Sequence, residues 1–320
     1  MSEQSVLMRR AAIASVSMAI LLTGAKTVAA VQTGSVSMLG SLADSALDLL
    51  ASLVTLMAVR IAMIPADDNH RFGHGKAEAI AALVQTGLIL VSAVGIGWRA
   101  VMRVLEPTPV EQPLMGVGVS VLAIAATLAL VLYQRSVVKR TRSIAIGTDM
   151  LHYQTDLLLN ASVIVALGLE SGLGLMGSDS VFGILIALYL AWRALRSARH
   201  AIDMLMDKEW LPERRMQVLQ LASSHPQIKG VHELRTRSSG SDDFIQFHIW
   251  VRPDMSVSEG HRIADEVEAR VRRAFPDADI LIHVDPAGHV EENERGMEPL
   301  QPQAQQLGRQ QGQQQGEPRA

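Results

Sequence analysis

The chain has 320 residues, of which 48% are hydrophobic and only 19% are charged, and its formal net charge is −3. Soluble domains usually carry about 25% charged residues, so this composition favours a membrane protein and gives no sign of nucleic acid as a partner. The absence of cysteine excludes disulfides and thiolate nucleophiles, so any bound metal must be held by histidine nitrogen or carboxylate oxygen.

The first two thirds of the chain consist of apolar stretches long enough to cross a bilayer, which takes about 20 apolar residues per helix. The first stretch follows a short charged start and resembles a signal peptide. Because further apolar stretches follow it, we interpret it as a transmembrane helix. We predict six such helices, at residues 11–31, 39–63, 78–104, 113–133, 144–170 and 179–199.

Basic residues mark one set of the predicted helix ends. That set comprises Arg9, Arg10, Arg60, Arg71, Lys76, Arg135, Lys139, Arg140, Arg142, Arg193, Arg196 and Arg199. The opposite loops, VQTGSV, EPTPVEQP and ESGLGLMGSD, are almost free of Lys and Arg. Since Lys and Arg gather in cytoplasmic loops, both termini are predicted to be cytoplasmic.

After residue 205 the pattern changes to that of a small soluble domain. An amphipathic helix begins near DKEWLPERRM, and VHELRTRSSG and SDDFIQFHIWVRP predict two strands joined by a turn. A second amphipathic helix carries Ile263, Val267 and Val271 on one face, and ADILIHVDP predicts a third strand. The order α-β-β-α-β predicts a two-layer α+β domain.

These patterns divide the chain into three parts. We predict an all-α transmembrane domain of six helices at residues 1–208 and a cytoplasmic α+β domain at residues 209–290. Residues 291–320 are rich in Gln, Gly and Pro and lack apolar side chains to bury, so we expect them to be disordered.

Ionisable side chains lie inside two of the predicted membrane helices. Asp44 and Asp48 share the second helix, and His152 and Asp156 share the fifth. Each charge there costs on the order of 3 kcal/mol, and the i, i+4 spacing puts both members of a pair on one face. A divalent cation would remove the repulsion between the carboxylates, and four O/N ligands suit Zn²⁺. The alternative is a polar network that only fixes helix packing.

Further polar residues extend these two faces. Asp149 and Asn160 continue the stripe on the fifth helix, and we expect Asp149 nearer the cytoplasmic mouth and Asn160 further out. On the second helix, Ser41, Ser45 and Ser52 surround the aspartate pair.

Two more candidate metal sites lie outside the membrane helices. The loop PADDNHRFGHGK holds two carboxylates and two imidazoles within eight residues, and its proline and glycines predict an irregular backbone that can wrap an ion; a solvated polar loop is the alternative. In the soluble domain, a metal cluster is favoured over ordinary surface histidines because five candidate ligands occur together. They are His232, His248, His261, His283 and Asp285.

Together, DSALD, DDNHRFGHGKAE and HYQTD resemble the motifs of the cation diffusion facilitators, over residues 1 to about 290. The resemblance implies a homodimer in the bacterial inner membrane that exports divalent metal in exchange for protons, with a cytoplasmic ferredoxin-like domain. It implies a transport site of Asp44, Asp48, His152 and Asp156, a second site of Asp67, His70 and His74, and a binuclear site of His232, His248, His261, His283 and Asp285.

Zn²⁺ is the favoured ion, both transported and bound as a structural or regulatory ion, and Cd²⁺ and Fe²⁺ are further substrates. Because O/N sites discriminate loosely, an exporter mainly of Fe²⁺ or Mn²⁺ stays open. A membrane metal sensor would not need the intramembrane carboxylates. An intramembrane metalloprotease would need a motif such as HExxH, which the chain lacks, so we expect no enzyme.

Overall fold

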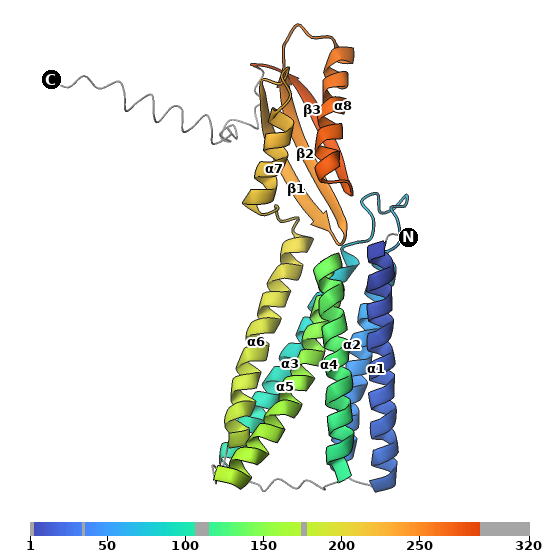
Figure 1. Ribbon diagram of the computed structural model, residues 1–320, viewed down its shortest axis with the longest axis vertical. Helices are drawn as coiled ribbons and strands as arrows, with labels where there is room; N and C mark the ends of the chain where they lie inside the picture. The colour runs from blue at the N-terminus through green and yellow to red at the C-terminus, as the bar shows by residue number, and fades with distance from the viewer. Residues whose placement is uncertain (1–2, 34–35, 106–114, 174–177, 289–320) are drawn as a thin grey trace, which may run out of the picture. The chain divides into compact units, whose positions relative to one another are not determined.

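The computed structural model describes residues 3–33, 36–105, 115–173 and 178–288 (Figure 1). Two compact units emerge, Met1–Met206 with Ser239–Ser241, and Asp207–Ser238 with Asp242–Ala320. The predicted disordered tail lies outside the described residues, and so does the side chain of Asp44.

The first unit is helical. Its helices are α1 (Glu3–Thr33), α2 (Val36–Ala62), α3 (Ala77–Leu105), α4 (Met115–Thr141), α5 (Ile144–Leu173) and α6 (Ser178–Leu205), and successive helices run in opposite directions (Figure 1). Within the described residues, four stretches are long and apolar enough to cross a membrane: Glu3–Val28, Ser45–Ala62, Ala77–Leu105 and Ser180–Leu205. The prediction of a helical membrane unit is confirmed, whereas the crossing of α4 and α5 stays a prediction.

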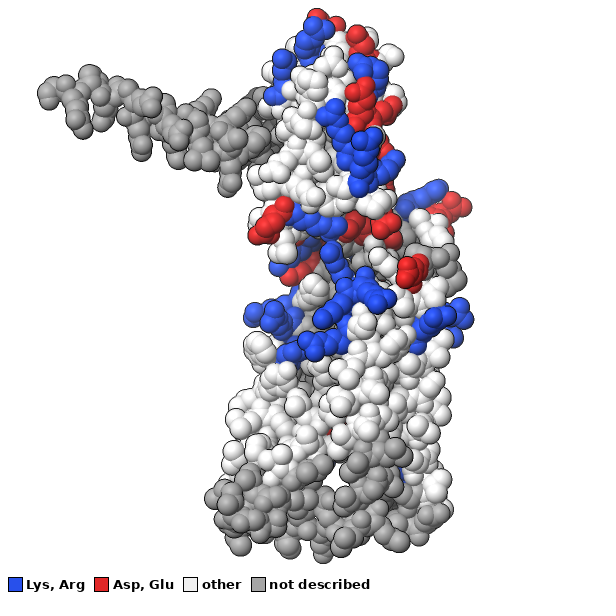
Figure 2. All heavy atoms as spheres, viewed as in Figure 1, with Lys and Arg blue, Asp and Glu red and all other residues white. Residues whose placement is uncertain are grey.

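Several helices extend beyond their apolar stretches. Helix α1 begins at Glu3, well before the predicted residue 11, and α4 and α6 continue to Thr141 and Leu205. The added turns of α1 and α4 contain Arg or Lys, which are good helix formers although they end the apolar run. On the face in Figure 2, Lys and Arg gather at the end of this unit where α1 begins, and most of the adjoining surface is uncharged.

Small side chains allow the helices of the membrane unit to pack closely. Ala11 and Ala12 of α1 and Ala145 of α5 are completely buried, and they share a core with Val59 of α2. Small residues let helix backbones approach each other where lipid offers no hydrophobic driving force. This packing holds α2 and α5, which carry the candidate ligands Asp48, His152 and Asp156, in one bundle.

The second unit contains α7 (Pro212–Ser223), β1 (Gly230–Ser239), β2 (Asp242–Val251), α8 (Val257–Ala274) and β3 (Ala278–Pro286), which confirms the predicted order. The described strands form a sheet in the order β1-β2-β3, in which β2 and β3 are parallel. Two residues join β1 to β2, and such a short connection makes that pair antiparallel. The sheet is therefore small and mixed, and a ferredoxin-like arrangement stays a prediction.

The core of the second unit lies between its helices and one face of the sheet. Ile263, Val267 and Val271 of α8 are completely buried, as their spacing predicted, and pack with Ile245 and Phe247 of β2. Alternation along β2 turns the next side chain, that of His248, to the other face. The histidines therefore lie on the face of the sheet that the core leaves to polar groups.

A capping box begins α8. The Ser256 hydroxyl accepts a hydrogen bond from the Glu259 backbone N–H at 3.2 Å, and the Glu259 carboxylate accepts one from the Ser256 backbone N–H at 3.0 Å. This backbone donor lowers the pKa of Glu259 below its usual value. The helix that backs the sheet is thus stabilised at its first turn.

Candidate metal centres

The intramembrane candidates come from two helices. Asp48 of α2 and His152 and Asp156 of α5 each offer a ligand atom, and these atoms lie within 4.8 Å of one another. The Nε2 atom of His152 is 2.7 Å from Oδ1 of Asp48, and only 8% of His152 is exposed. The two helices thus bring two partly buried carboxylates and a buried imidazole together, which suits a divalent cation.

Asp149 does not belong to this group. Its side chain is completely buried, and its carboxylate accepts hydrogen bonds from three other helices, through Ser15, Thr55 and Gln134. Asn160 is exposed, and its amide donates to the backbone oxygen of Asp156 at 2.7 Å. The predicted stripe on α5 is therefore divided between two polar networks.

Sequence reasoning missed the contacts of Tyr153, which follows the candidate ligand His152. This tyrosine is 1% exposed, its hydroxyl donates to the backbone oxygen of Ser15 at 2.9 Å, and it lies 2.9 Å from the Ser52 hydroxyl. The only signal in the sequence was an amphipathic side chain between two ligands in HYQTD. A buried Tyr hydroxyl needs a partner, and the sequence does not say which.

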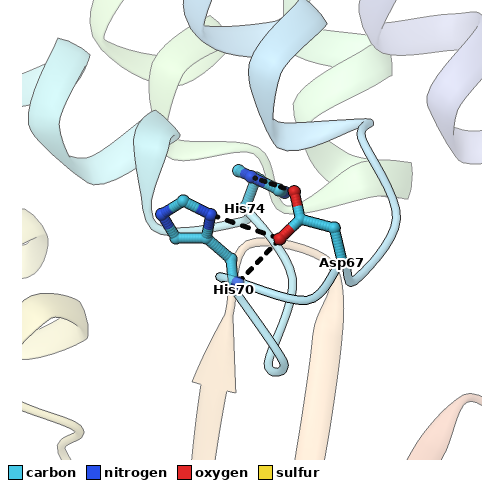
Figure 3. Close-up of side chains that lie close together, drawn as sticks. All are labelled: Asp67, His70 and His74. Atoms are coloured by element: carbon cyan, nitrogen blue, oxygen red, sulfur yellow. Dashed lines mark hydrogen bonds and ion pairs between the residues drawn. The ribbon is translucent and has the colours of Figure 1, made fainter.

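The loop between α2 and α3 brings Asp67, His70 and His74 together, with ligand atoms within 4.8 Å of one another (Figure 3). Oδ1 of Asp67 is 3.4 Å from Nδ1 of His70, and its Oδ2 is 3.5 Å from Nε2 of His74. The Nδ1 atom of His74 lies 3.3 Å from the Ile64 backbone oxygen, which orients Nε2 towards the carboxylate. Gly73, at φ 75°, supplies the turn between the histidines.

Backbone donors hold the Asp67 carboxylate in place. Its Oδ1 accepts from the backbone N–H of His70 at 2.7 Å and of Asn69 at 2.9 Å, and these bonds, that of His70 first, lower the pKa of Asp67 below its usual 3.8. The neighbouring Asp68 is almost fully exposed and pairs with Arg71 at 3.0 Å. The loop therefore uses one of its two aspartates in the group.

The cytoplasmic candidates meet around one carboxylate. Oδ2 of Asp285 is 2.9 Å from Nδ1 of His248 and 3.4 Å from Nε2 of His232, and its Oδ1 is 3.1 Å from Nε2 of His283. Strands β2 and β3 are paired in parallel, and their register places His248 opposite His283. Asp285 is 6% exposed. Three imidazoles around a buried carboxylate fit the ligand preferences of Zn²⁺.

His261 is the candidate that the structure does not bring into this group. Its side chain is 77% exposed, and its Nε2 lies 3.6 Å from Asp265 on the same helix. Glu233, which the sequence analysis missed, lies closer: its Oε2 is 3.8 Å from Nε2 of His248, and its backbone has a φ of 48° inside β1. The sequence signal was an acidic residue beside His232.

Comparisons with known proteins agree with this arrangement. Residues 12–206 match the cation efflux transmembrane domain, and residues 211–287 match the cytoplasmic domain of cation efflux proteins. The cation-efflux pump FieF of Salmonella paratyphi A (strain ATCC 9150 / SARB42) is 41% identical over 292 residues, which cover 91% of this chain and 97% of the relative. FieF of Escherichia coli (strain K12 / DH10B) is 42% identical with the same coverage.

Solved structures match the cytoplasmic part. The metal-bound C-terminal domain of the CzcD transporter from Thermotoga maritima is 28% identical, with a TM-score of 0.24, and covers 25% of this chain and 93% of that chain. The putative zinc transporter CzrB in its Zn form is 34% identical, with a TM-score of 0.25, and the match covers 27% of this chain and 99% of that chain.

Both matched domains and both full-length relatives are cation efflux proteins, and none of them is an enzyme. The resemblance to the cation diffusion facilitators that the motifs carry is confirmed over nearly the whole length of these relatives. The chain therefore belongs to the cation efflux family, the cation diffusion facilitators.

Proposed function

We propose that this protein exports divalent metal ions, Zn²⁺ foremost, across the bacterial inner membrane in exchange for protons. The observation that carries the proposal is the group of Asp48, His152 and Asp156 on two helices, whose ligand atoms lie within 4.8 Å of one another around the buried His152. A cation pathway explains why a membrane unit contains ionisable groups that are expensive to insert. Asp44, one turn before Asp48, is the proposed fourth ligand.

The contact between His152 and Asp48 suggests how metal and protons exchange. Without metal, a proton lies between Nε2 of His152 and Oδ1 of Asp48, which are 2.7 Å apart. A metal ion arriving from the cytoplasm needs the same lone pair, so its binding displaces the proton. A proton arriving from the outer side restores the contact and releases the metal. If each protomer alternates between inward-facing and outward-facing states, these steps form an antiport cycle.

The donor set favours Zn²⁺ among the possible metals. Oxygen and nitrogen ligands of this number suit Zn²⁺ and accept Cd²⁺, and they do not exclude Fe²⁺ or Mn²⁺. An exporter mainly of Fe²⁺ or Mn²⁺ is thus the second candidate, and a non-transporting metal sensor is the third.

The cytoplasmic domain is proposed to hold resident metal and to join two protomers. His232, His248 and Asp285 would hold one ion, with His283 and His261 contributing to a second. Metal bound there would cross-link three neighbouring strands. The loop group of Asp67, His70 and His74 is proposed as an additional, exposed site. We further propose that all six long helices cross the membrane with both termini in the cytoplasm, following the distribution of Arg and Lys.

Flux through liposomes tests the function. Protein reconstituted with a pH gradient should move Zn²⁺, while Asp156→Ala protein should not exceed empty liposomes. Asp68→Asn, which changes an exposed carboxylate paired with Arg71, is the control and should transport normally. Flux of Fe²⁺ or Mn²⁺ above that of Zn²⁺ would favour the second candidate. No flux of any metal from folded, dimeric protein would favour the sensor.

A further inference from the structure

Helix α5 uses two neighbouring faces for different tasks. His152 and Asp156 face the metal group, whereas Asp149 and Tyr153 reach the polar side chains and backbone of other helices. Both pairs have i, i+4 spacing, which places each pair on one face. The second face directly adjoins the first, so it can control where the ligands lie.

The Tyr153 hydroxyl connects three helices. Its single hydrogen is donated to the Ser15 backbone oxygen on α1 at 2.9 Å, so the Ser52 hydroxyl on α2, also at 2.9 Å, donates to the tyrosine oxygen. Tyr153 is 1% exposed and Ser52 is completely buried. Hydrogen bonds shielded in this way from water hold their geometry strongly.

These hydrogen bonds lie close to the candidate metal ligands along both helices. Tyr153 follows His152 directly, and Ser52 lies four residues after Asp48 on the same helix. The Tyr153–Ser52 bond therefore joins the two ligand-bearing helices one turn away from the contact of Asp48 with His152. A change in the length of that bond moves the ligands of α2 relative to those of α5.

The Ser15 anchor is itself held in place. Its hydroxyl donates to the Asp149 carboxylate, and Gln134 of α4 donates to both the Ser15 hydroxyl and that carboxylate, at 2.7 Å each. Tyr153 is thus fixed against a network of buried polar groups rather than against a single mobile side chain. Tyr153 can hold α2 and α5 at one spacing only if its own hydrogen-bond partner, Ser15, is fixed.

We propose that the Tyr153 hydroxyl is a positioning group that sets the spacing of α2 and α5 at the metal group and thereby favours Zn²⁺ over the larger Cd²⁺. The inference rests on the proposed transport function. Sites distinguish ions of different size by cavity size and rigidity, and Zn²⁺ needs ligands at about 2.0–2.2 Å. A helix pair held at one spacing while the ion is bound favours the shorter bonds of Zn²⁺ over the longer bonds of Cd²⁺.

The test is the ratio of kcat/KM for Zn²⁺ to that for Cd²⁺ in liposomes, together with equilibrium affinities for both ions. Tyr153→Phe removes the hydroxyl and keeps the ring. We expect the Zn²⁺:Cd²⁺ ratio to fall about tenfold, which corresponds to the low end of the affinity losses that follow removal of groups orienting metal ligands, borne mainly by Zn²⁺. Tyr189→Phe is the matched control: Tyr189 lies on α6, is 39% exposed and accepts a bond from Arg193, so its ratio should not change.

Ser52→Ala removes only the bond between α2 and α5 and should shift the ratio in the same direction by a smaller factor. It decides the question if Tyr153→Phe protein does not fold. An equal loss for both ions, or a ratio that is unchanged or higher, overturns the inference. Absence of Zn²⁺ and Cd²⁺ flux from the wild-type protein refutes the proposed function instead, so the two failures are distinguishable.

Discussion

The membrane group and the cytoplasmic group collect similar ligands in different ways. In the membrane unit, His152 and Asp156 are one turn apart on a helix and meet Asp48 from a second helix. In the cytoplasmic unit, His248 and Asp285 belong to different strands and meet through the register of the sheet.

The two groups differ in how strongly the residue type alone indicates a functional site. A carboxylate in a membrane helix is expensive, so its presence already indicates a task. A histidine in a soluble domain is commonplace, and His225, which contacts Glu266 at 2.9 Å in the same domain, has no part in the metal group. Only contact with the other ligands separates the two kinds of histidine.

The largest expected effect comes from Asp48→Asn, which tests whether the membrane group alone carries transport. The variant removes a ligand charge and the partner of His152. Zn²⁺ flux should fall to the background of empty liposomes, while the metal content of the cytoplasmic domain stays unchanged. Asp254→Asn, an exposed carboxylate, is the control. Flux near the wild-type level would show that the buried pair is not the transport site.

The second effect comes from Asp285→Asn, which removes the carboxylate that three imidazoles share. Zinc affinity of the cytoplasmic domain should fall by about 10–100-fold, and the dimer should dissociate more readily, while transport is reduced but not abolished. Competition titration and sedimentation measure both. Asp279→Asn, exposed on the same strand, should behave as wild type. Unaltered zinc content in the Asp285→Asn protein would contradict the assignment.

A smaller effect distinguishes the folding stability of the cytoplasmic domain from its affinity for zinc. Ser256→Ala removes the side-chain half of the capping box at α8 and should lower the free energy of unfolding of this domain by about 1 kcal/mol. Zinc affinity at His232, His248 and Asp285 should not change, because these residues lie on the strands and not on α8. Denaturant unfolding of the full chain followed on the domain's tryptophans measures this, with Ser258→Ala as control. Equal destabilisation by both variants would argue against the cap.

The smallest effect concerns the exposed loop. Its Asp67 has a pKa below 3.8 in the folded loop, so the ionised carboxylate stabilises the turn above pH 3.8, and this contribution is lost as pH falls through the lower folded pKa. Asp67→Asn should therefore speed hydrogen exchange of the Asn69 and His70 amides at neutral pH, and the difference from wild type should shrink below pH 3.8. Asp68→Asn should change neither. A difference in exchange rate that grows as the pH falls would contradict the lowered pKa of Asp67.

Much of the candidate chemistry could be predicted locally. The pairs His152 with Asp156 and His283 with Asp285 follow from helical and strand periodicity, and the loop ligands lie within eight residues of one another. Asp149 was placed in one polar stripe with His152 and Asp156 because position on one helix says nothing about which neighbouring helix a side chain meets. For the same reason, the contact of Glu233 with His248 was not foreseen.

The amino-acid sequence by itself determined the helical membrane unit, the α-β-β-α-β order and the ligand pairs within single elements, because hydrophobic burial and side-chain periodicity act over a few residues. Tertiary structure decided which elements face each other: the β2–β3 register that sets His248 opposite His283, and the packing that joins Tyr153 to Ser15 and Ser52. Such contacts join residues far apart in the chain, and they follow from the packing of whole elements rather than from any local pattern.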